Sequence, residues 1–514
     1  MLLGEVAERL GASLSAEAAL GSGAALASSA AQRAVSGVRH DSRAVTPGDV
    51  FVAIPGATVD GSAFARDAVA RGAVAVVSER DILEMGAPVL VVRNARAALG
   101  PLAHAVYGDP TARMRVAGIT GTNGKTTTTW LLEGALEVLG ERPALLGTVL
   151  TRVCGVEKAS AFTTPEADDL ARFASDAVAA GATHLSMEVS SHGLALHRVD
   201  GVHFEVAAFT NLTQDHLDFH GTLDAYLEAK ARLFLELGPS VSVINIDDPA
   251  GASLADRVTD HIHGRVLRVS PRGQGRADIR AERADFTREG IVAVLRTPDG
   301  VCELRSPLFG AHNLENLLVA FGVLLAMGVS SEAAARALGS QLGAPGRLER
   351  VSDPRGVAVL VDYAHSPDAL RNVLAALRPL TAGRLIAVFG CGGDRDRTKR
   401  PRMGEAVRAG ADMAVLTSDN PRTEAPERIV DDVLPGLAGW SKLSAADFAH
   451  ATSGFAVEPD RGAAIRLALE GARSGDTVLI AGKGHEDYQI VGTEKRPFDD
   501  RAEAARAIAS LGGP

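Results

Sequence analysis

With 514 residues, the chain is long enough for about three domains of ordinary size. Hydrophobic residues make up 46% of it and aromatic residues only 4%, which predicts a buried core of aliphatic side chains. The net charge of −10 argues against a nucleic-acid partner and against an anionic membrane surface. Cys154, Cys302 and Cys391 are odd in number and lack metal-ligand spacing, as is typical of a reducing compartment.

Export and membrane insertion are not expected either. Glu5, Glu8 and Arg9 interrupt the Ala-rich start, and no basic segment precedes it, so we do not interpret it as a signal peptide. No apolar run approaches the ~18 residues of a membrane-spanning helix. We therefore expect a cytoplasmic protein, and a monomer, with no membrane and no nucleic acid as partners.

The first segment, residues 1–111, is predicted to be a small α/β domain. Short β-like runs alternate in it with helical patterns, and a Gly-Asp-Pro sequence at 108–110 is typical of a linker. The predicted strands are 50–54, 73–77 and 88–92, and the predicted helices are 62–71 and 95–107.

The second segment, residues 112–343, opens with an apolar run that leads into three glycines, Gly118, Gly121 and Gly124. Lys125 and a helical pattern follow. Strand, glycine-rich loop and helix together make a phosphate-binding loop, because backbone N–H groups and a helix N-terminus converge on the phosphates. Gly118 lies one residue too early for the common pattern, but we still predict nucleoside triphosphate binding. Lys125 would reach the β- and γ-phosphates, and the Thr126 hydroxyl would hold Mg²⁺.

Metal-competent side chains follow two later strands, predicted at 184–189 and 206–212. Glu188 ends the first of them, where a carboxylate is a natural Mg²⁺ ligand or else a solvated charge. After the second comes a run dense in Asp and His. Here we expect His216 to hold a metal and His220 to bond within a turn. A further strand is predicted at 241–246 and an apolar helix at 314–327.

Lys230 belongs to a helix predicted at 223–234 and lies on the apolar stripe formed by Leu223, Leu227, Phe234 and Leu237. A buried ammonium is costly, so the amine must be neutralised, paired or chemically changed, unless its stem merely snorkels to solvent. Close to a Mg²⁺–triphosphate site, the amine could carry CO₂ as a carbamate and offer oxygen to a second metal.

Lysine is scarce in this chain, with seven residues among 53 lysines and arginines. A retained lysine is therefore a mild indication that an amine is required. Lys125 and Lys483 both follow a glycine, and Lys230 is on a helix.

The third segment, residues 344–514, begins after a Gly-Ala-Pro-Gly break. Its strands are predicted to end at Val361, Val388, Leu416 and Ile480, each before a polar or Gly-rich loop. Strands that alternate with helices predict parallel sheets, with ligands outside the carboxyl ends of the strands.

Five motifs, in order along almost the whole chain, resemble those of the Mur ligases, ATP-dependent amide-forming enzymes of peptidoglycan precursor synthesis. They are GTNGKTT at 121–127, EVSS at 188–191, DHLD at 215–218, HNLEN at 312–316 and DYAHSP at 362–367. The resemblance implies an α/β fold of three domains. A small N-terminal domain (1–111) would hold a UDP-sugar. A central P-loop ATPase-like parallel-sheet domain (112–343) would bind ATP, and a C-terminal Rossmann-like domain (344–514) would bring an amino acid.

The same resemblance implies roles for individual residues. Lys125, His216 and Lys230 would be catalytic; Thr126 and Glu188 would hold one Mg²⁺, and His216 and carbamylated Lys230 a second. ATP would contact Gly121, Thr122, Asn123, Gly124, Lys125, Thr126, Thr127, Asn313, Asn316, Arg347 and Asp362, the last two completing its site from the third domain. The UDP-muramoyl dipeptide would contact Ser42, Thr163, Thr164, Ser190 and Arg198.

Two details of the substrate segment bear on these roles. The Thr-Thr-Pro-Glu sequence at 163–166 is also typical of a helix start, with an N-cap, Pro at the first helical position and an acidic first turn. Leu196 stands where the resembled subfamily often has a glutamine, so one polar contact must be absent or replaced.

The sequence Asp419-Asn420-Pro421-Arg422 resembles the signature of the family member that adds 2,6-diaminopimelate, whereas lysine-adding relatives lack the arginine. Diaminopimelate is lysine with a second, distal carboxylate, which a guanidinium reads through two hydrogen bonds. Arg395 would take another carboxylate, and Gly482 and Glu486 would take the ammonium. The implied reaction joins diaminopimelate to the D-glutamate of the UDP-muramoyl dipeptide. Another ligase of the superfamily, or a P-loop regulatory module without ligation, remains the alternative.

Overall fold

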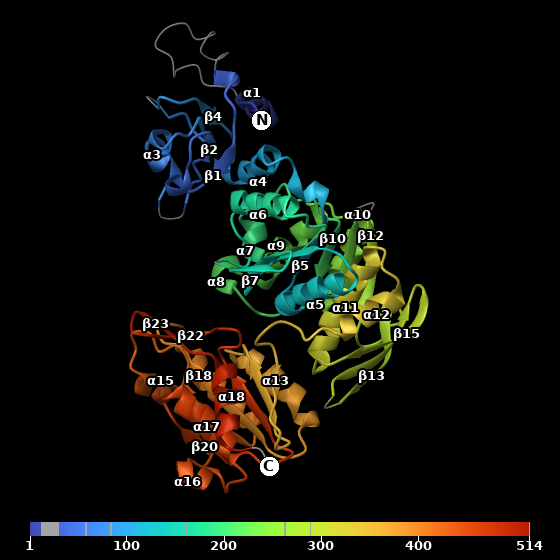
Figure 1. Cartoon of the computed structure of the whole chain (residues 1–514), viewed down its shortest axis with the longest axis vertical. Helices are drawn as coiled ribbons and strands as arrows, with labels where there is room; N and C mark the ends of the chain where they lie inside the picture. The colour runs from blue at the N-terminus through green and yellow to red at the C-terminus, as the bar shows by residue number, and fades with distance from the viewer. Residues whose placement is uncertain are drawn as a thin grey trace. The chain divides into compact units, whose positions relative to one another are not determined.

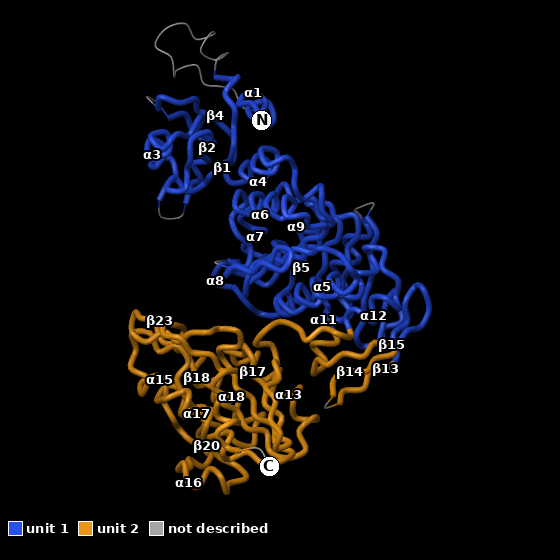
Figure 2. Tube along the Cα trace, in the orientation of Figure 1, with its two compact units in different colours: residues 1–282, 295–302, 315–338 blue, residues 283–294, 303–314, 339–514 orange. Residues whose placement is uncertain are grey.

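The computed structural model describes residues 1–11, 30–56, 59–82, 85–160, 162–261, 264–287 and 289–512. They divide into two compact units, shown in different colours in Figure 2. Unit 1 comprises residues 1–282, 295–302 and 315–338, and unit 2 comprises residues 283–294, 303–314 and 339–514. Most of the Ala-rich start, residues 12–29, lies outside the described residues.

Unit 1 begins with a small sheet of four parallel strands in the order β1-β2-β3-β4 (Figure 1). Its strands are β1 (Gly37–Arg39), β2 (Asp49–Val52), β3 (Ala75–Ser78) and β4 (Val89–Val91), and its helices are α1 (Leu3–Arg9), α3 (Ala65–Ala70) and α4 (Ala95–Val106). The predicted helix at 62–71 starts as a 3-10 turn, Gly61–Phe64, whose first turn the Asp60 carboxylate caps. The predicted small α/β domain is therefore present as a separate sheet.

The phosphate loop belongs to a second, larger sheet, in which neighbouring strands follow the order β12-β11-β10-β5-β9-β6-β7-β8. Its parallel strands are β5 (Arg115–Thr120), β6 (Pro143–Leu146), β9 (His184–Glu188), β10 (Val206–Phe209), β11 (Val241–Asn245) and β12 (Arg265–Ser270), and β7 (Leu150–Val153) and β8 (Val156–Ala159) form an antiparallel edge. Helices around this sheet include α5 (Lys125–Val138), α6 (Ala167–Ala179), α7 (Ser191–Ala195), α8 (Leu217–His220), α9 (Leu223–Leu235) and α10 (Pro249–His261).

β5 lies between β9 and β10, and its residues are almost completely buried. A parallel strand covered on both faces explains the continuous apolar sequence before the first glycines of the loop. The same register brings the carboxyl ends of β5, β9 and β10 to one edge. The division between the units runs through β13 (Ile279–Phe286), β14 (Ile291–Thr297), β15 (Gly300–Ser306), α11 (Ala311–Ala326) and α12 (Ser331–Gly339).

Unit 2 contains a six-stranded sheet in the order β16-β17-β21-β18-β19-β20, in which only β16 is antiparallel. Its strands are β16 (Glu349–Val351), β17 (Ala358–Asp362), β18 (Leu385–Cys391), β19 (Met413–Ser418), β20 (Gly454–Val457) and β21 (Thr477–Ala481), and a hairpin of β22 (Tyr488–Val491) and β23 (Glu494–Pro497) follows. The helices are α13 (Pro367–Leu377), α14 (Lys399–Gly410), α15 (Pro426–Val433), α16 (Ala445–Phe448), α17 (Arg461–Gly471) and α18 (Asp500–Ser510).

Side chains alternate between the two faces of this sheet, so each face carries its own core. Phe389 of β18 packs in a cluster with residues of α13, α14 and α15, while the preceding Val388 packs with residues of α17 and α18. Helices on both faces of a parallel sheet are the Rossmann-like arrangement that the sequence predicts.

The predicted fold class, α/β with a separate sheet in each of three domains, is confirmed. The predicted strand and helix limits agree with the structure to within three residues, the largest differences including β18, which runs on to Cys391 rather than ending at Val388. The domain boundaries near residues 111 and 343 stay predictions. Among the described residues, no helix has both the length and the apolar character needed to cross a bilayer.

A buried ion pair between α17 and α18 generates a prediction about stability. Arg461 Nε and Nη2 each lie 2.7 Å from an oxygen of Asp500, and both side chains are 0% exposed. Asp500→Ala leaves the guanidinium buried without its counter-charge, which costs about 3–5 kcal/mol. We expect a loss of this size in urea unfolding followed by Trp440 fluorescence, in a Trp130→Phe background.

The matched control is Glu494→Ala, which removes an ion pair with Arg496 whose side chains are 69% and 60% exposed. Exposed pairs contribute about 0–1 kcal/mol, so this variant should unfold at nearly the wild-type urea concentration. An Asp500→Ala variant as stable as Glu494→Ala would contradict the assignment.

Candidate active site

The glycines of the phosphate loop are required by close approaches as well as by backbone conformation. Gly121 and Gly124 have φ values of +149° and +87°. A Cβ on Gly121 would lie 1.9 Å from the Thr210 hydroxyl, and one on Gly124 would lie 2.2 Å from Oδ1 of Asn316. A larger residue would therefore push the loop away from the end of β10 at Gly121 and away from α11 at Gly124.

The segment after β10 holds the loop through hydrogen bonds that the sequence did not predict. The Thr210 hydroxyl donates to the Asn123 carbonyl at 2.6 Å, and the Asn123 N–H donates to Oδ1 of Asn211 at 2.9 Å. The Thr122 N–H donates to the Asn211 carbonyl at 2.8 Å. Thr210 and Asn211 thus act as supports of the loop. Their position directly after a strand was the only signal in the sequence.

Two lysine amines meet at one carbonyl of this loop. Nζ of Lys125 and Nζ of Lys230 each lie 2.8 Å from the Gly121 carbonyl oxygen, and Lys125 also donates to the Thr122 carbonyl. Lys230 is 1% exposed, with Nζ 4.3 Å from the centre of the Tyr226 ring. Burial, and then the charge of Lys125, lowers the pKa of Lys230 well below its usual value.

The prediction that Lys230 lies on a core face is confirmed, and snorkelling is excluded by its burial. The predicted stripe itself is partly wrong, because Leu223 is 45% exposed. Leu223 is the first residue of α9, where the helix has only begun, and the buried face starts with Tyr226.

Glu188 is completely buried at the end of β9 and accepts hydrogen bonds from neutral donors. Its Oε2 accepts from the Thr126 hydroxyl at 3.0 Å and from the Thr148 hydroxyl at 3.1 Å, and its Oε1 accepts from the Thr148 N–H at 2.7 Å. The alternative of a solvated charge is therefore wrong. A buried carboxylate beside a hydroxyl, next to a phosphate loop, is an oxygen donor set that fits Mg²⁺.

His216 belongs to a group of rings beside this region. It has φ of +52° and a half-exposed side chain, and its ring centre lies 4.8 Å from that of His192 and 6.3 Å from that of Tyr226. The Lys230 amine also lies over the Tyr226 ring, so Tyr226 is a neighbour of both His216 and Lys230. His220 Nε2 lies 3.0 Å from the hydroxyl of Ser191 in α7, so its contact joins two elements and is not the predicted bond within a turn.

Four of the five predicted contacts of the muramoyl substrate lie near the end of β9: Thr163 and Thr164 from the segment before α6, and Ser190 and Arg198 from the segment after β9. The Thr164 hydroxyl donates to the Glu188 carbonyl and accepts from the Ser190 N–H, both at 3.0 Å. Arg198 Nη1 donates to the Thr164 carbonyl at 3.1 Å, and the Thr163 hydroxyl lies 3.0 Å from that of Thr148. Ser42 begins a 3-10 turn after β1, in the small sheet.

The predicted helix start at Thr-Thr-Pro-Glu is wrong, because α6 begins at Ala167 and Glu166 occupies the N-cap position. The Thr164 hydroxyl is engaged with β9 instead, and the Glu166 carboxylate forms ion pairs with Arg96 at 3.1 Å and Arg198 at 2.8 Å. Nη1 of Arg96 also lies 3.5 Å from the Leu196 carbonyl, so a guanidinium is the polar group beside Leu196.

A further contact joins β1 to α6. His40 Nδ1 lies 2.7 Å from Oδ1 of Asp168, and the His40 N–H donates to Oδ2 of the same carboxylate at 3.1 Å. Asp168 is 1% exposed. This contact fixes the loop that carries Ser42 to the start of α6, and no pattern in the sequence predicted it.

Unit 2 contains three residues predicted to reach the nucleotide, of which Arg347 precedes β16 and Asp362 is the last residue of β17. Asp362 accepts from the Leu348 N–H at 2.8 Å and from the Ala364 N–H at 2.9 Å, and burial raises its pKa. The Arg347 guanidinium lies 4.8 Å from the centre of the Tyr363 ring. Asn313, also predicted, donates from its side-chain amide to the Phe309 carbonyl at 2.9 Å.

Asn420 is the centre of the predicted amino-acid region. Its Oδ1 accepts from Lys483 Nζ at 3.0 Å and from the Ile490 N–H at 2.9 Å, and its Nδ2 donates to Oε2 of Glu486 at 3.0 Å. Lys483 is 0% exposed and also lies 3.5 Å from Oδ1 of Asp419. Burial lowers the pKa of Lys483 and raises that of Glu486. Lys483 had no predicted role; its retention after a glycine was the signal.

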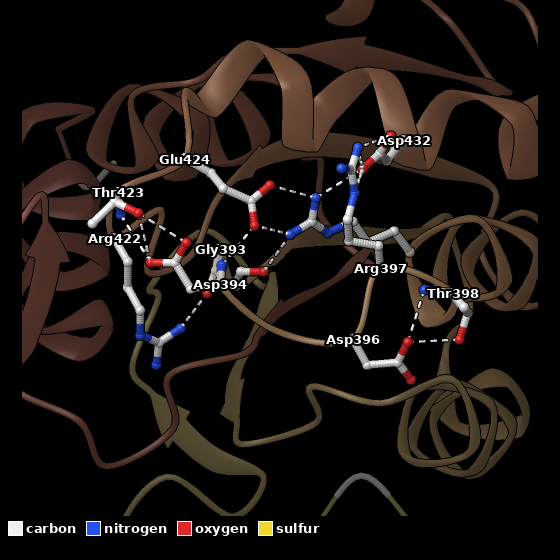
Figure 3. Close-up of polar contacts among 11 residues, drawn as sticks. Gly393, Asp394, Asp396, Arg397, Thr398, Arg422, Thr423, Glu424 and Asp432 are labelled. Atoms are coloured by element: carbon white, nitrogen blue, oxygen red, sulfur yellow. Dashed lines mark hydrogen bonds and ion pairs between the residues drawn. The ribbon is translucent and has the colours of Figure 1, made fainter.

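Arg422 lies beside this group with its backbone fixed to the β22–β23 hairpin. Its φ is +52°, its N–H donates to the Ile490 carbonyl at 3.0 Å, and its Nη1 donates to the Gly393 carbonyl at 2.8 Å (Figure 3). A Cβ on Gly393 would lie 1.9 Å from the Pro421 carbonyl oxygen, so the two loops touch. Gly482 follows β21 with φ of +127°, and Arg395 is exposed.

Family models match most of the chain. The model described as the Mur ligase family catalytic domain matches residues 34–107, that of the Mur ligase middle domain matches residues 119–324, and that of the Mur ligase glutamate ligase domain matches residues 346–484. The chain therefore belongs to the Mur ligase family.

Individual relatives are similar over nearly their whole length. UDP-N-acetylmuramoyl-L-alanyl-D-glutamate–2,6-diaminopimelate ligase of Gloeobacter violaceus is 48% identical over 92% of this chain and 94% of its own. The protein of the same name from Solibacter usitatus is 44% identical over 95% of this chain and 96% of its own. A solved structure of a ligase of that name has a TM-score of 0.71 at 36% identity, over 93% of this chain and 95% of that one.

The burial of the Lys230 amine generates a prediction about stability and pH. Lys230→Met keeps the length of the side chain and removes the buried amine, so we expect unit 1 to gain about 1–3 kcal/mol at neutral pH. Because the pKa of Lys230 is lowered in the folded chain, the unfolded chain binds the extra proton. Wild-type stability should therefore rise with pH towards 10.5, and the advantage of the variant should shrink.

Urea unfolding followed by Trp130 fluorescence in a Trp440→Phe background, in CO₂-free buffer, measures this difference. A Lys230→Met variant that is less stable than wild type, or an advantage that grows with pH, would contradict the buried-amine interpretation.

Proposed function

We propose that the chain is an ATP-dependent, ADP-forming ligase that joins 2,6-diaminopimelate to the γ-carboxylate of D-glutamate in UDP-N-acetylmuramoyl-L-alanyl-D-glutamate. The relatives that are 44–48% identical over 92–95% of the chain carry this activity in their names. The reaction belongs to cytoplasmic peptidoglycan precursor synthesis. We infer that the enzyme works as a monomer, with these substrates and without nucleic acid or membrane.

The observation that carries the choice of amino acid is the pairing of opposite charges in one region of unit 2. Asp419, Asn420 and Glu486 present oxygen atoms that accept from an ammonium, and the Gly482 carbonyl adds another. Arg422 and Arg395 present guanidinium groups for carboxylates, and Pro421 sets the turn before Arg422. Diaminopimelate carries both kinds of charge at its distal end, whereas lysine has no distal carboxylate. Arg422 therefore favours diaminopimelate.

ATP binding is assigned to the phosphate loop and to four residues of the later motifs. The loop residues are Gly121, Thr122, Asn123, Gly124, Lys125, Thr126 and Thr127, and the others are Asn313, Asn316, Arg347 and Asp362. Lys125 supports this assignment, because its amine rests on the Gly121 and Thr122 carbonyls at 2.8 Å, ready to turn to the β- and γ-phosphates.

The donor sets of unit 1 suit two Mg²⁺ ions. Thr126 and Glu188 would hold the first, and their hydrogen bond of 3.0 Å places both oxygens on one side of the loop. His216 and carbamylated Lys230 would hold the second. A carbamate forms when the neutral Lys230 amine attacks CO₂ and releases a proton, and the lowered pKa of Lys230 favours the neutral amine. When bound, the metal ions neutralise charge on the phosphates.

The muramoyl substrate is assigned to Ser42, Thr163, Thr164, Ser190 and Arg198. Nε of Arg198 is buried and donates to no acceptor among the described residues, which leaves one donor of this guanidinium for an anionic ligand. Arg198 then orients the dipeptide so that its γ-carboxylate approaches the phosphate loop.

The chemistry follows from this placement. A γ-carboxylate oxygen attacks the γ-phosphorus of ATP, the bond to the β-phosphate oxygen breaks, and ADP leaves. The amine of diaminopimelate attacks the acyl phosphate, loses a proton, and expels inorganic phosphate from the tetrahedral intermediate. Lys125 stabilises the transferring phosphoryl group, which is where most of the catalysis of such a step arises.

The proposal is tested by phosphate release with the UDP-muramoyl dipeptide, ATP and either diaminopimelate isomers or L-lysine. Wild type should prefer diaminopimelate. Arg422→Ala should lose on the order of a hundredfold in kcat/KM for diaminopimelate, because a charge pair in a dry site contributes about 2–5 kcal/mol. The kcat/KM for L-lysine should fall far less, since L-lysine has no distal carboxylate.

Arg422→Gly is the matched variant, because glycine accepts the φ of +52° without strain. Both variants should show the same collapse of the diaminopimelate-to-lysine ratio, with an unchanged KM for ATP. Equal losses with both amino acids would make Arg422 a scaffold residue and remove the physical support for diaminopimelate.

A second prediction concerns Lys230. Lys230→Arg should be as inactive as Lys230→Ala, because a guanidinium does not carry a stable carbamate. Formate or acetate should partly restore Lys230→Ala by supplying the missing oxygen ligand, and should do nothing for Lys125→Ala, whose defect is a lost cation. Full activity of Lys230→Arg in the phosphate-release assay would leave ordinary ion pairing as the role of Lys230.

A further inference from the structure

Two loops of unit 2 carry the arginines assigned to the carboxylates of the amino acid. One loop follows β18 and contains Gly393, Asp394 and Arg395, and the other follows β19 and contains Arg422, Thr423 and Glu424. Figure 3 shows Gly393 and Asp394 of the first loop beside the three residues of the second. Asp394 and Arg422 are non-glycine residues with φ of +53° and +52°. Such conformations cost on the order of 1–3 kcal/mol each and persist only where the surroundings enforce them.

What enforces them is a crossed pair of carboxylates, Asp394 and Glu424. Oε1 of Glu424 accepts from the Asp394 N–H at 2.6 Å, and Oδ2 of Asp394 accepts from the Thr423 N–H at 3.1 Å. The Thr423 hydroxyl also donates to Asp394, at 2.9 Å. Each loop thus binds the backbone of the other, one residue away from Arg395 and Arg422.

A buried arginine of α14 fixes Glu424 in turn. Arg400 is 0% exposed, with Nη1 2.9 Å and Nη2 2.8 Å from the two oxygens of Glu424, and Nη2 also donates to the Gly392 carbonyl at 3.1 Å. The hydrogen bonds from Arg400 and from the Asp394 N–H lower the pKa of Glu424 to about 2. Glu424 is therefore ionised at any assay pH.

Asp432 of α15 provides a comparison within the same cluster. It lies 2.8 Å from Nη1 of Arg400 and also pairs with Arg397 at 2.9 Å. Asp432 therefore holds two guanidinium groups, one of them that of Arg397 in the loop after β18, and it accepts from the side chain of that loop and not from its backbone. Of the two carboxylates, Glu424 is the one that joins Arg400 to a backbone N–H of the loop directly beside Arg395.

We propose that Glu424 is a positioning residue for the choice of amino acid. It holds the two arginine-bearing loops together, so that Arg395 and Arg422 bind the carboxylates of the same amino acid. The inference rests on the proposed function. Loss of Glu424 frees the Asp394 N–H and lets the two loops separate, which weakens the reading of a distal carboxylate and leaves ATP binding unchanged.

The test compares Glu424→Ala with Asp432→Ala, since each removes one carboxylate from Arg400. Initial rates of phosphate release give kcat and KM for diaminopimelate, L-lysine and ATP. Glu424→Ala should raise KM for diaminopimelate tenfold or more and lower the diaminopimelate-to-lysine ratio of kcat/KM by a similar factor. Asp432→Ala should keep that ratio within about twofold of wild type, although it breaks more ion pairs.

Glu424→Gln provides the conservative variant, because its side-chain oxygen still accepts from the Asp394 N–H. It should retain a ratio between those of wild type and Glu424→Ala, and it carries the test if Glu424→Ala does not fold, as judged by Trp440 fluorescence. An unchanged ratio in the Glu424 variants, or an equal fall in Asp432→Ala, overturns the positioning role. A wild-type enzyme that does not ligate diaminopimelate overturns the proposed function instead, so the two failures are distinguishable.

Discussion

The Gly121 carbonyl, which accepts a hydrogen bond from both Lys125 and Lys230, is the constraint on which the central site depends. Two amines lie 2.8 Å from one oxygen, one of them 1% exposed, and burial together with the charge of Lys125 lowers the pKa of Lys230. In the proposed reaction, an incoming triphosphate would draw Lys125 away from this carbonyl, and the neutral Lys230 amine would react with CO₂. Each of these two events would relieve the crowding of the amines at the Gly121 carbonyl.

Both units use the same device at the carboxyl ends of their parallel strands. In unit 1 the carboxylate of Glu188 accepts hydrogen bonds from the hydroxyls of Thr126 and Thr148. In unit 2 the carboxylates of Asp394 and Glu424 accept hydrogen bonds from backbone N–H groups of neighbouring loops. A parallel sheet brings these ends to one edge but does not fix the loops that follow. Carboxylates that accept these hydrogen bonds hold the loops in place, and they put negative charge at the same edge of each sheet.

The sequence predicted the parts of the fold that depend on local pattern. Apolar runs predicted the strand limits to within three residues, glycine spacing predicted the phosphate loop, and helical spacing predicted that Lys230 is buried. The helix start near residue 166 was wrong because Thr164 bonds to β9 rather than to its own helix. The exposure of Leu223 was not predicted, because a stripe of apolar residues does not show at which residue the helix begins to pack against its neighbours.

The supports of the site could not be predicted for a related reason. Thr210, Lys483 and Glu424 act on partners that are distant in sequence, at Asn123, Asn420 and Arg400 respectively. Such contacts depend on which strands lie side by side in the sheet, and that order cannot be read from the pattern of a single sequence. The residues that bind the ligand have recognisable chemistry, whereas those that hold them in place resemble any surface threonine or glutamate.

The carbamate on Lys230 is tested most directly by ¹³C NMR of the purified enzyme in ¹³C-bicarbonate with Mg²⁺. The account predicts a carbamate resonance in wild type that is absent from Lys230→Met, and that exchanges slowly because the site is buried. A wild-type spectrum without that resonance, from enzyme that is fully active in the same buffer, would contradict it.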